Sequence, residues 1–66
     1  MLNTIKVERA KKNITQADLA KVIDVSRLTI HSIEVGKFNP SILIALKIAR
    51  YFDISVDKLF MLEEGD

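Results

Sequence analysis

The chain of 66 residues contains no cysteine, only two glycines and a single histidine. Without cysteine it forms neither a disulfide nor a thiolate metal site, and a lone histidine does not complete a metal site. Two glycines do not supply a glycine-rich phosphate loop, and no Ser/His/Asp arrangement is present. A chain this short also lacks room for an enclosed substrate pocket. We therefore expect no enzyme, cofactor, metal or small-molecule ligand.

Long apolar runs are also missing. The longest, such as that from Ile42 to Leu46, is far too short to cross a membrane. The N-terminal stretch MLNTIKVERAKKN lacks the apolar core of a secretory signal. We expect a cytoplasmic protein with one domain over residues 1–66. A chain of this size buries only about 60% of its unfolded surface, so a homodimer is expected to supply further burial.

Charge is distributed unevenly along the chain. Residues 1–50 hold nine Lys or Arg against four Asp or Glu, a net charge of +5, and residues 51–66 hold one Lys against five acids, a net charge of −4. A basic region of this kind is compatible with binding to phosphates. An ordinary solvated surface explains the same count equally well.

Residues 15–36, TQADLAKVIDVSRLTIHSIEVG, have the pattern of two short helices joined by a tight turn. Thr15 and Asp18 have the spacing of a capping box at the start of the first helix. Ser26 is the N-cap of the second helix, and Gly36 is its C-terminal stop. This pattern predicts a helix-turn-helix. Its apolar positions are Leu19, Ile23, Val25, Ile30 and Ile33, with the small residue Ala20 near the crossing.

The second of these helices has a polar outward arc. At about 100° per residue, Arg27, Leu28, His31 and Ser32 share one side, away from the inward isoleucines. They lie near the N-terminal end, which is the end that a recognition helix presents to base edges in the major groove. Arg27 is the best candidate for recognising guanine, and Leu28 for contacting a thymine methyl group. We interpret His31 as a polar surface residue.

The remaining pattern predicts three more helices and an all-α fold. The first runs from about Asn3 or Thr4 to Lys12. Another begins after Pro40, is capped by Ser41 and runs to about Tyr51. A short last one is capped by Ser55 and runs to about Phe60. Met61 and Leu62 are placed to pair with Met1 and Leu2 as terminal strands. The helix after Pro40 has a predicted buried stripe of Ile42, Ala45, Leu46, Ala49 and Phe52.

Arg9 and Glu34 are predicted to form an ion pair. Arg9 lies one turn after the inward Ile5, and Glu34 lies beside Ile33. A half-buried pair would join the first helix to the second helix of the helix-turn-helix. Two unrelated surface charges are the alternative interpretation.

The motifs TQADLA, VSRLTIHSIEVGKFNPS, IALKIARYF and ISVDKLF together resemble those of the phage-repressor-like (Cro-type) helix-turn-helix family, also called the xenobiotic-response-element family. The chain is also similar in length to small stand-alone dimeric regulators of that family. The resemblance implies a five-helix domain that binds double-stranded DNA, commonly as a dimer on a palindromic operator. It also implies a structural ion pair at Arg9 and Glu34. The DNA-binding residues that it implies are Gln16, Ser26, Arg27, Leu28, Thr29, His31, Ser32, Lys37, Phe38 and Asn39.

Two departures from the family pattern affect the site. Asp24 stands where glycine is usual in the turn, although aspartate tolerates left-handed backbone better than most residues. Leu28 stands where a polar residue is common, which argues against an adenine contact there.

Several apolar residues exceed what the small core needs. A homodimer interface explains them most simply, and it would place two recognition helices about 34–36 Å apart on one face of DNA. The alternative function is a protein-interaction module, either an antitoxin-like partner or a scaffold. The predicted interface residues are Leu43, Phe60, Met61 and Leu62.

Overall fold

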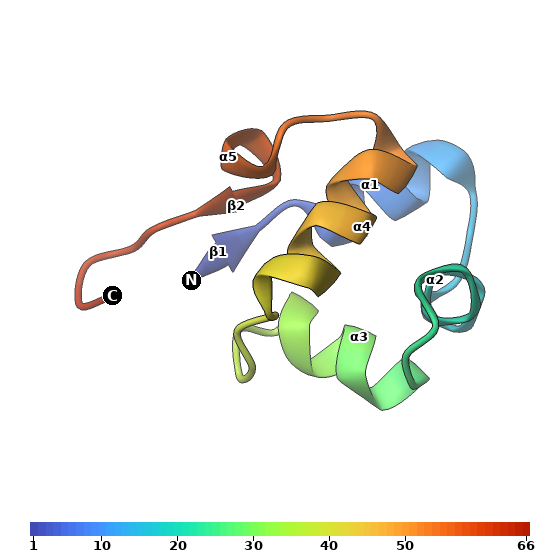
Figure 1. Ribbon diagram of the computed structural model, residues 1–66, viewed down its shortest axis with the longest axis horizontal. Helices are drawn as coiled ribbons and strands as arrows, with labels where there is room; N and C mark the ends of the chain where they lie inside the picture. Colours follow the sequence, from blue (N-terminus) through green and yellow to red (C-terminus); the bar gives the residue numbers. More distant parts are fainter.

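The computed structural model describes residues 1–66 and contains five helices and a pair of short strands (Figure 1). This confirms the all-α architecture and the terminal strand pairing. None of the helices has both the length and the apolar character that a membrane crossing requires. The elements are β1 (Leu2–Asn3), α1 (Ile5–Lys12), α2 (Gln16–Ile23), α3 (Arg27–Glu34), α4 (Ile42–Phe52), α5 (Val56–Leu59) and β2 (Phe60–Met61).

The helix starts are fixed by side-chain caps. Thr15 and Asp18 form the predicted capping box, in which the Asp18 N–H donates to Thr15 Oγ1 over 3.0 Å and the Thr15 N–H donates to Asp18 Oδ2 over 2.9 Å. The donation from the Thr15 backbone holds the pKa of Asp18 below its usual value. Ser26 and Ser41 cap α3 and α4 as predicted. Ser55 was predicted to cap α5, but its side chain makes no cap hydrogen bond there.

Three of the helices end on a residue with left-handed backbone. Asn13, Asp24 and Asp53 have φ angles of 55°, 65° and 57°, at the ends of α1, α2 and α4 respectively. Asp24 therefore adopts the conformation that glycine adopts most easily. The third helix stops at Glu34, slightly before the predicted stop, and Gly36 follows it with a φ of 80°.

The core lies between α2, α3 and α4 and is closed by Ile5 of α1, Leu59 of α5 and Phe60 of β2. The predicted positions of α2 and α3 are buried, and Val25 in the turn is half-buried against the same cluster. The twelve buried side chains are Ile5, Leu19, Ala20, Ile23, Ile30, Ile33, Ala45, Ile48, Ala49, Phe52, Leu59 and Phe60.

The predicted stripe of α4 is wrong in part. Ile42 and Leu46 are 72% and 51% exposed, whereas Ile48, which the stripe omitted, is fully buried. Nearly every position of this helix is apolar, so spacing alone does not select one face. The small residues Ala45 and Ala49 face the core together with Ile48.

The two strands form an antiparallel ribbon that joins the ends of the chain. Leu2 pairs with Met61, as predicted, and Asn3 pairs with Phe60. Phe60 is only 7% exposed and belongs to the core, which corrects its assignment to a dimer surface. Leu62 lies beyond the ribbon and is exposed.

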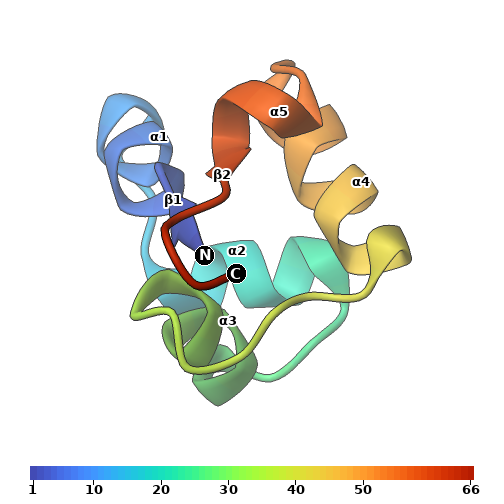
Figure 2. The ribbon, with the colours of Figure 1, turned by 90° about the vertical axis from the view of Figure 1, so that its left-hand side faces the viewer.

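Two perpendicular views show how the helices are arranged around the core. In Figure 1, α4 lies at the front and α3 runs along the lower edge, with α5 above. Figure 2 shows α1 and α4 on opposite sides, and the chain ends on the face between them. The outward side of α3 therefore points away from the rest of the molecule.

Candidate nucleic-acid interface

Helix α3 runs along the lower edge of the molecule (Figure 1), and the residues on its outward side are exposed or half-buried. Arg27 and His31 are exposed, Leu28 is 64% exposed, and Ser32 is half-buried. The opposite side of the helix is anchored by Ile30 and Ile33, which are almost completely buried. Because its inner side is fixed, α3 presents this row in a single orientation.

Gln16, at the start of α2, connects the row to the interior. Its Nε2 donates to Glu34 Oε1 over 3.2 Å and lies 3.3 Å from Nδ1 of His31. Its Oε1 accepts from Nη1 of Arg27 over 3.3 Å. One amide thus contacts two exposed residues of α3 and the half-buried carboxylate of Glu34.

Glu34 is held in turn by Arg9 of α1. Arg9 Nε lies 2.7 Å from Glu34 Oε2, and its Nη2 donates to Oε1 over 3.0 Å, so the pair is bidentate. The two side chains are 14% and 6% exposed. Arg9 also donates to the carbonyl of Ile14. Hydrogen bonding to Glu34 keeps the pKa of Arg9 above its usual value. The bidentate pair ties α1 to α3.

A polar hollow between α1 and α3 adds residues that sequence reasoning missed. Lys6 lines it together with Gln16 and His31, and places an exposed cation on this side of the molecule. Asn3 also lines it, and its Nδ2 donates to the carbonyl of Ile33 over 2.9 Å. No spacing pattern in the sequence indicates Asn3 or Lys6, because both lie far from α3 along the chain and come close to it only in the folded protein.

The loop after α3 forms a second part of this surface. Phe38 is 48% exposed and lines a hollow of about 230 Å³ with Leu28 and Ser32. Lys37 and Asn39 on either side of Phe38 are exposed. The loop therefore presents one cation and one amide beside the outward row of α3.

Two of the predicted DNA-binding residues have structural contacts of their own. The Ser26 hydroxyl accepts from the Thr29 N–H over 3.0 Å, and the two hydroxyl oxygens are 2.8 Å apart. Their side chains therefore define the start of α3.

The residues predicted for a dimer interface lie elsewhere on the molecule. Met61 and Leu62 follow α5, and Leu43 lies on the outward side of α4.

Two helices joined by a tight turn, with the second anchored inside and polar outside, define a helix-turn-helix domain. The profile of the helix-turn-helix family matches residues 5–59. The chain belongs to this family, and within it to the phage-repressor-like (Cro/C1) type of regulator.

Several similar proteins match this chain over almost the whole of their own length. An uncharacterized HTH-type transcriptional regulator of Methanocaldococcus jannaschii is 46% identical over 66 residues, covering 100% of both chains. Another from Archaeoglobus fulgidus is 47% identical over 66 residues, covering 100% of this chain and 93% of its own. The uncharacterized HTH-type transcriptional regulator YgzD of Bacillus subtilis is 39% identical over 64 residues, covering 97% of each chain.

Proposed function

We propose that this protein is a sequence-specific transcriptional repressor that binds a palindromic operator as a homodimer, with residues 1–66 acting as one DNA-binding domain in the cytoplasm. The observation that carries the proposal is the outward row of α3, which is exposed on one side and anchored by buried isoleucines on the other. A helix held in this way fits the major groove of B-DNA, which admits an α-helix.

In this function, the residues divide into those that read bases and those that contact the phosphate backbone. Arg27 is exposed and carries the planar fork that pairs with O6 and N7 of guanine. Leu28 offers an apolar surface to a thymine methyl group. Lys37 and Asn39 in the loop, and Gln16, hold backbone phosphates and set the register. Repression follows from occupying a promoter.

The first test is selection of bound sequences from a random pool of double-stranded DNA, followed by binding measurements with two variants. We expect Arg27→Ala to lose about 1–3 kcal/mol of discrimination at one base-pair position of each half-site. Lys37→Ala should weaken binding to all sequences by a similar factor. An unchanged base-preference profile for Arg27→Ala would reject the assignment of Arg27, and failure to enrich any sequence would reject specific DNA binding.

A further inference from the structure

His31 is the single histidine of the chain, and it is exposed on the outward side of α3. A neutral imidazole ring has one nitrogen that donates a hydrogen bond and one that accepts, and the contacts of the ring determine which is which. One of the two nitrogens, Nδ1, lies 3.3 Å from Nε2 of Gln16. The hydrogen-bonding role of the whole ring therefore depends on which way the Gln16 amide is turned.

Opposite charges at its two ends fix the orientation of the Gln16 amide. The carboxylate of Glu34 only accepts hydrogen bonds, and its Oε1 lies 3.2 Å from Gln16 Nε2. The guanidinium of Arg27 only donates, and its Nη1 lies 3.3 Å from Gln16 Oε1. An amide turned the other way would set oxygen against oxygen at Glu34 and N–H against N–H at Arg27. The NH2 group of Gln16 therefore faces Glu34 and His31.

The carboxylate of Glu34 is itself held in place. It forms the bidentate pair with Arg9, whose Nε lies 2.7 Å from Oε2 and whose Nη2 lies 3.0 Å from Oε1. The Glu34 side chain is only 6% exposed, so it is not free to turn toward solvent. A continuous chain of hydrogen bonds thus runs from Arg9 through Glu34 and Gln16 to His31. The ion pair therefore sets the direction of donation at the exposed ring.

The two ring nitrogens consequently have different roles. Nδ1 accepts from the second N–H of the Gln16 amide, so the single proton of the neutral ring is on Nε2. Nε2 makes no hydrogen bond within the chain, and His31 is exposed. Its N–H is therefore available to a ligand on the outward side of α3. Arg27 lies one turn earlier on the same side, because residues four positions apart are neighbours on the surface of a helix.

We propose that His31 acts in DNA binding as a hydrogen-bond donor only, and that its Nε2–H contacts an acceptor on a base edge in the major groove. This inference rests on the proposed function and specifies the chemistry that one residue recognises. The acceptors of that groove are N7 of both purines, O6 of guanine and O4 of thymine, whereas cytosine presents only its N4 amino donor. The base that His31 contacts is therefore guanine, adenine or thymine, and cytosine is rejected. Gln16 is a positioning residue for this contact.

The surroundings of His31 favour a base over a phosphate as the acceptor. A DNA phosphate would also accept from Nε2, but a neutral ring brings no charge to such a contact. Exposed cations for phosphates are present nearby at Lys6 and Lys37. His31 instead shares its side of α3 with Arg27, the residue that is proposed to recognise guanine.

Nuclear magnetic resonance of the ring nitrogens tests the position of the proton without DNA. Because the chain has a single histidine, labelling histidine with the heavy nitrogen isotope gives signals from one ring, and a protonated ring nitrogen differs from an unprotonated one in chemical shift. The measurement is made in mildly alkaline buffer, where an ordinary histidine ring is neutral. We expect the proton on Nε2 in the native protein. Gln16→Glu replaces the donor beside Nδ1 by an acceptor, so we expect the proton on Nδ1 in this variant.

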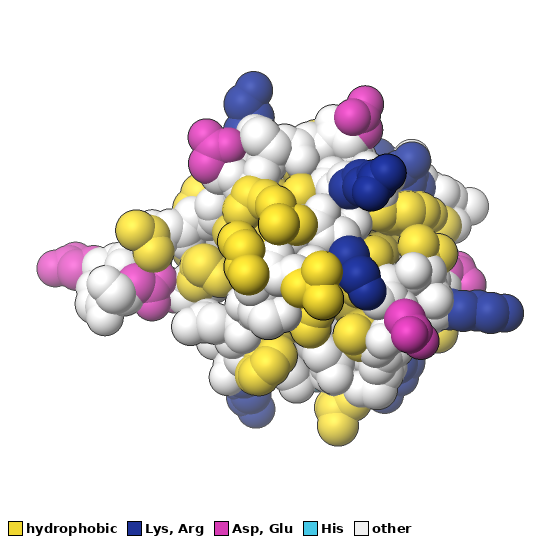
Figure 3. Space-filling model, in the orientation of Figure 1, with side chains coloured by type: hydrophobic (Ala, Val, Ile, Leu, Met, Phe, Trp, Pro, Cys, Tyr) yellow, Lys and Arg dark blue, Asp and Glu magenta, His cyan; other side chains and the backbone are white.

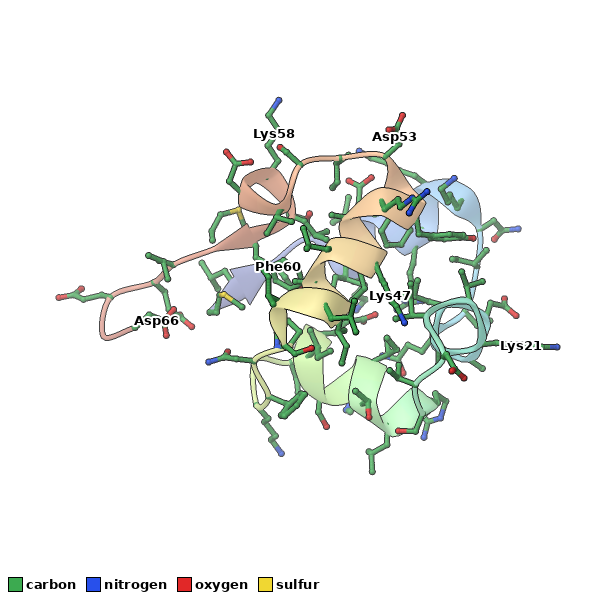
Figure 4. The ribbon with its side chains drawn as sticks, in the orientation of Figure 1. Lys21, Lys47, Asp53, Lys58, Phe60 and Asp66 are labelled. Carbon is green, nitrogen blue, oxygen red and sulfur yellow. The ribbon has the colours of Figure 1, made fainter.

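Two controls lower the net charge by one, as Gln16→Glu does. Lys21→Gln changes the same helix, and Figure 4 shows the Lys21 side chain pointing away from the molecule. Lys47→Gln changes the face of α4, where Figure 3 shows apolar side chains beside Lys and Arg, with no histidine in view. Both controls should leave the signals of the His31 ring unchanged.

The Gln16→Glu variant is expected to fold, because an acidic residue is favourable at the first position of a helix. Circular dichroism should confirm this for every variant. A proton on Nδ1 in the native protein, or ring signals that Gln16→Glu leaves unchanged, would overturn the inference.

Binding to operators altered at each base pair tests what the ring recognises. The operators come from the selection described above, and the native protein is compared with His31→Ala and Gln16→Glu. At one base of each half-site we expect cytosine to bind more weakly than the accepting bases by about twofold to tenfold, the range of one neutral hydrogen bond, and His31→Ala to abolish this difference. Gln16→Glu turns Nε2 into an acceptor, so it should also remove the penalty against cytosine. If His31→Ala weakens every operator by one factor, the ring contacts a phosphate and the base assignment is overturned.

The two measurements separate this inference from the proposed function. If the ring responds to Gln16→Glu as expected but the native chain selects no DNA sequence, the proposed function fails and the orientation of the ring's hydrogen bonds stands. If the native chain selects a sequence but the ring proton does not respond to Gln16→Glu, the proposed function stands and this inference fails.

Discussion

Gln16 connects a nearly buried ion pair to the surface that is proposed to read DNA. Its amide contacts Glu34, His31 and Arg27, and Glu34 is fixed by Arg9. Arg27 is a long exposed side chain that would otherwise sample many rotamers. The hydrogen bond from Arg27 to Gln16 reduces this freedom before DNA arrives, and ordering a flexible side chain in advance improves binding.

We therefore expect Gln16→Ala to reduce discrimination at the base-pair position that Arg27 reads, by about 0.5–1.5 kcal/mol. Competition binding with operators altered at that position measures the change. The matched comparison is Lys37→Ala, which should weaken all operators alike. If Gln16→Ala weakens every operator by one factor and leaves discrimination at that position unchanged, Gln16 acts on phosphates only and does not position Arg27.

The pair of Arg9 and Glu34 is predicted to dominate single-residue effects on stability. Glu34→Gln leaves the Arg9 charge poorly paired in a site where the side chains are 14% and 6% exposed, and we expect a loss of about 3–5 kcal/mol in the free energy of unfolding. Urea denaturation followed by circular dichroism measures it. The double variant Arg9→Met with Glu34→Leu should lose much less, because it leaves no unpaired charge. Equal losses in both variants would contradict this account.

At the scale of elements, the turn between α2 and α3 determines how α3 packs against α2. Asp24 occupies this turn with φ of 65° and ψ of 49°, and its N–H donates to the Ala20 carbonyl. Left-handed backbone is unfavourable for residues with a Cβ and least so for Asn and Asp among them. The turn therefore forms with aspartate, at a cost that glycine would remove.

We expect Asp24→Gly to raise the free energy of unfolding by about 0.5–1 kcal/mol, because relief of the left-handed conformation exceeds the added entropy of an unfolded glycine. Asp24→Ala should lower it, since alanine keeps the Cβ and loses the polar side chain that favours this conformation. Thermal unfolding of the native protein, Asp24→Gly and Asp24→Ala measures their order of stability. An order in which alanine is the most stable would show that the turn is not under backbone strain.

The elements differ in how far the sequence predicts them. Caps such as Thr15 and Ser41 are local interactions, so the spacing of residues suffices to predict them. The inward side of α4 depends instead on which neighbouring helix approaches, and Ile48 is selected over Leu46 by packing that no local pattern contains. Phe60 was assigned to the surface for the same reason, since the core position it fills is created by the closing of the terminal ribbon.

The same distinction applies to the candidate site. The outward row of α3 follows from helical periodicity, and the exposure of Arg27, Leu28 and His31 agrees with it. The contacts of Gln16 with that row, and the presence of Lys6 beside it, depend on how α1 and α2 lie against α3. The spacing of residues along the sequence therefore does not predict which of them lie beside α3 in the folded protein.

At the scale of the whole molecule, positive and negative charge occupy different regions. Residues 1–50 carry a net charge of +5 and residues 51–66 carry −4. Part of the negative charge is paired within the chain, because the N-terminal ammonium of Met1 lies 2.8 Å from Glu63 Oε1 and 3.2 Å from Asp66 Oδ2. The side of the molecule that is proposed to face DNA carries exposed cations, including Lys6 and Lys37.

The affinity for an operator should accordingly fall with salt concentration, because phosphate contacts release counterions. We expect Lys37→Ala to reduce the slope of log affinity against log salt by about 1 per removed contact. Titrations between 50 and 200 mM salt, which is roughly the range over which such effects are large, measure the slope. Lys58→Glu is the comparison, since it changes charge on α5 and should leave the slope unchanged; an equal fall there would indicate a general charge effect.

The terminal ribbon is fastened to the end of α3 by Asn3. Its amide donates to the Ile33 carbonyl over 2.9 Å, its Oδ1 accepts from the Ile5 N–H, and the Met1 carbonyl oxygen lies 3.6 Å from the point where a side chain on Gly36 would begin. Opening the ribbon therefore removes a hydrogen bond from the last turn of α3. A ligand that steadies α3 should therefore also slow hydrogen exchange at the backbone amides of the ribbon, so that deuterium uptake at residues 2–3 reports whether the outward side of α3 is occupied.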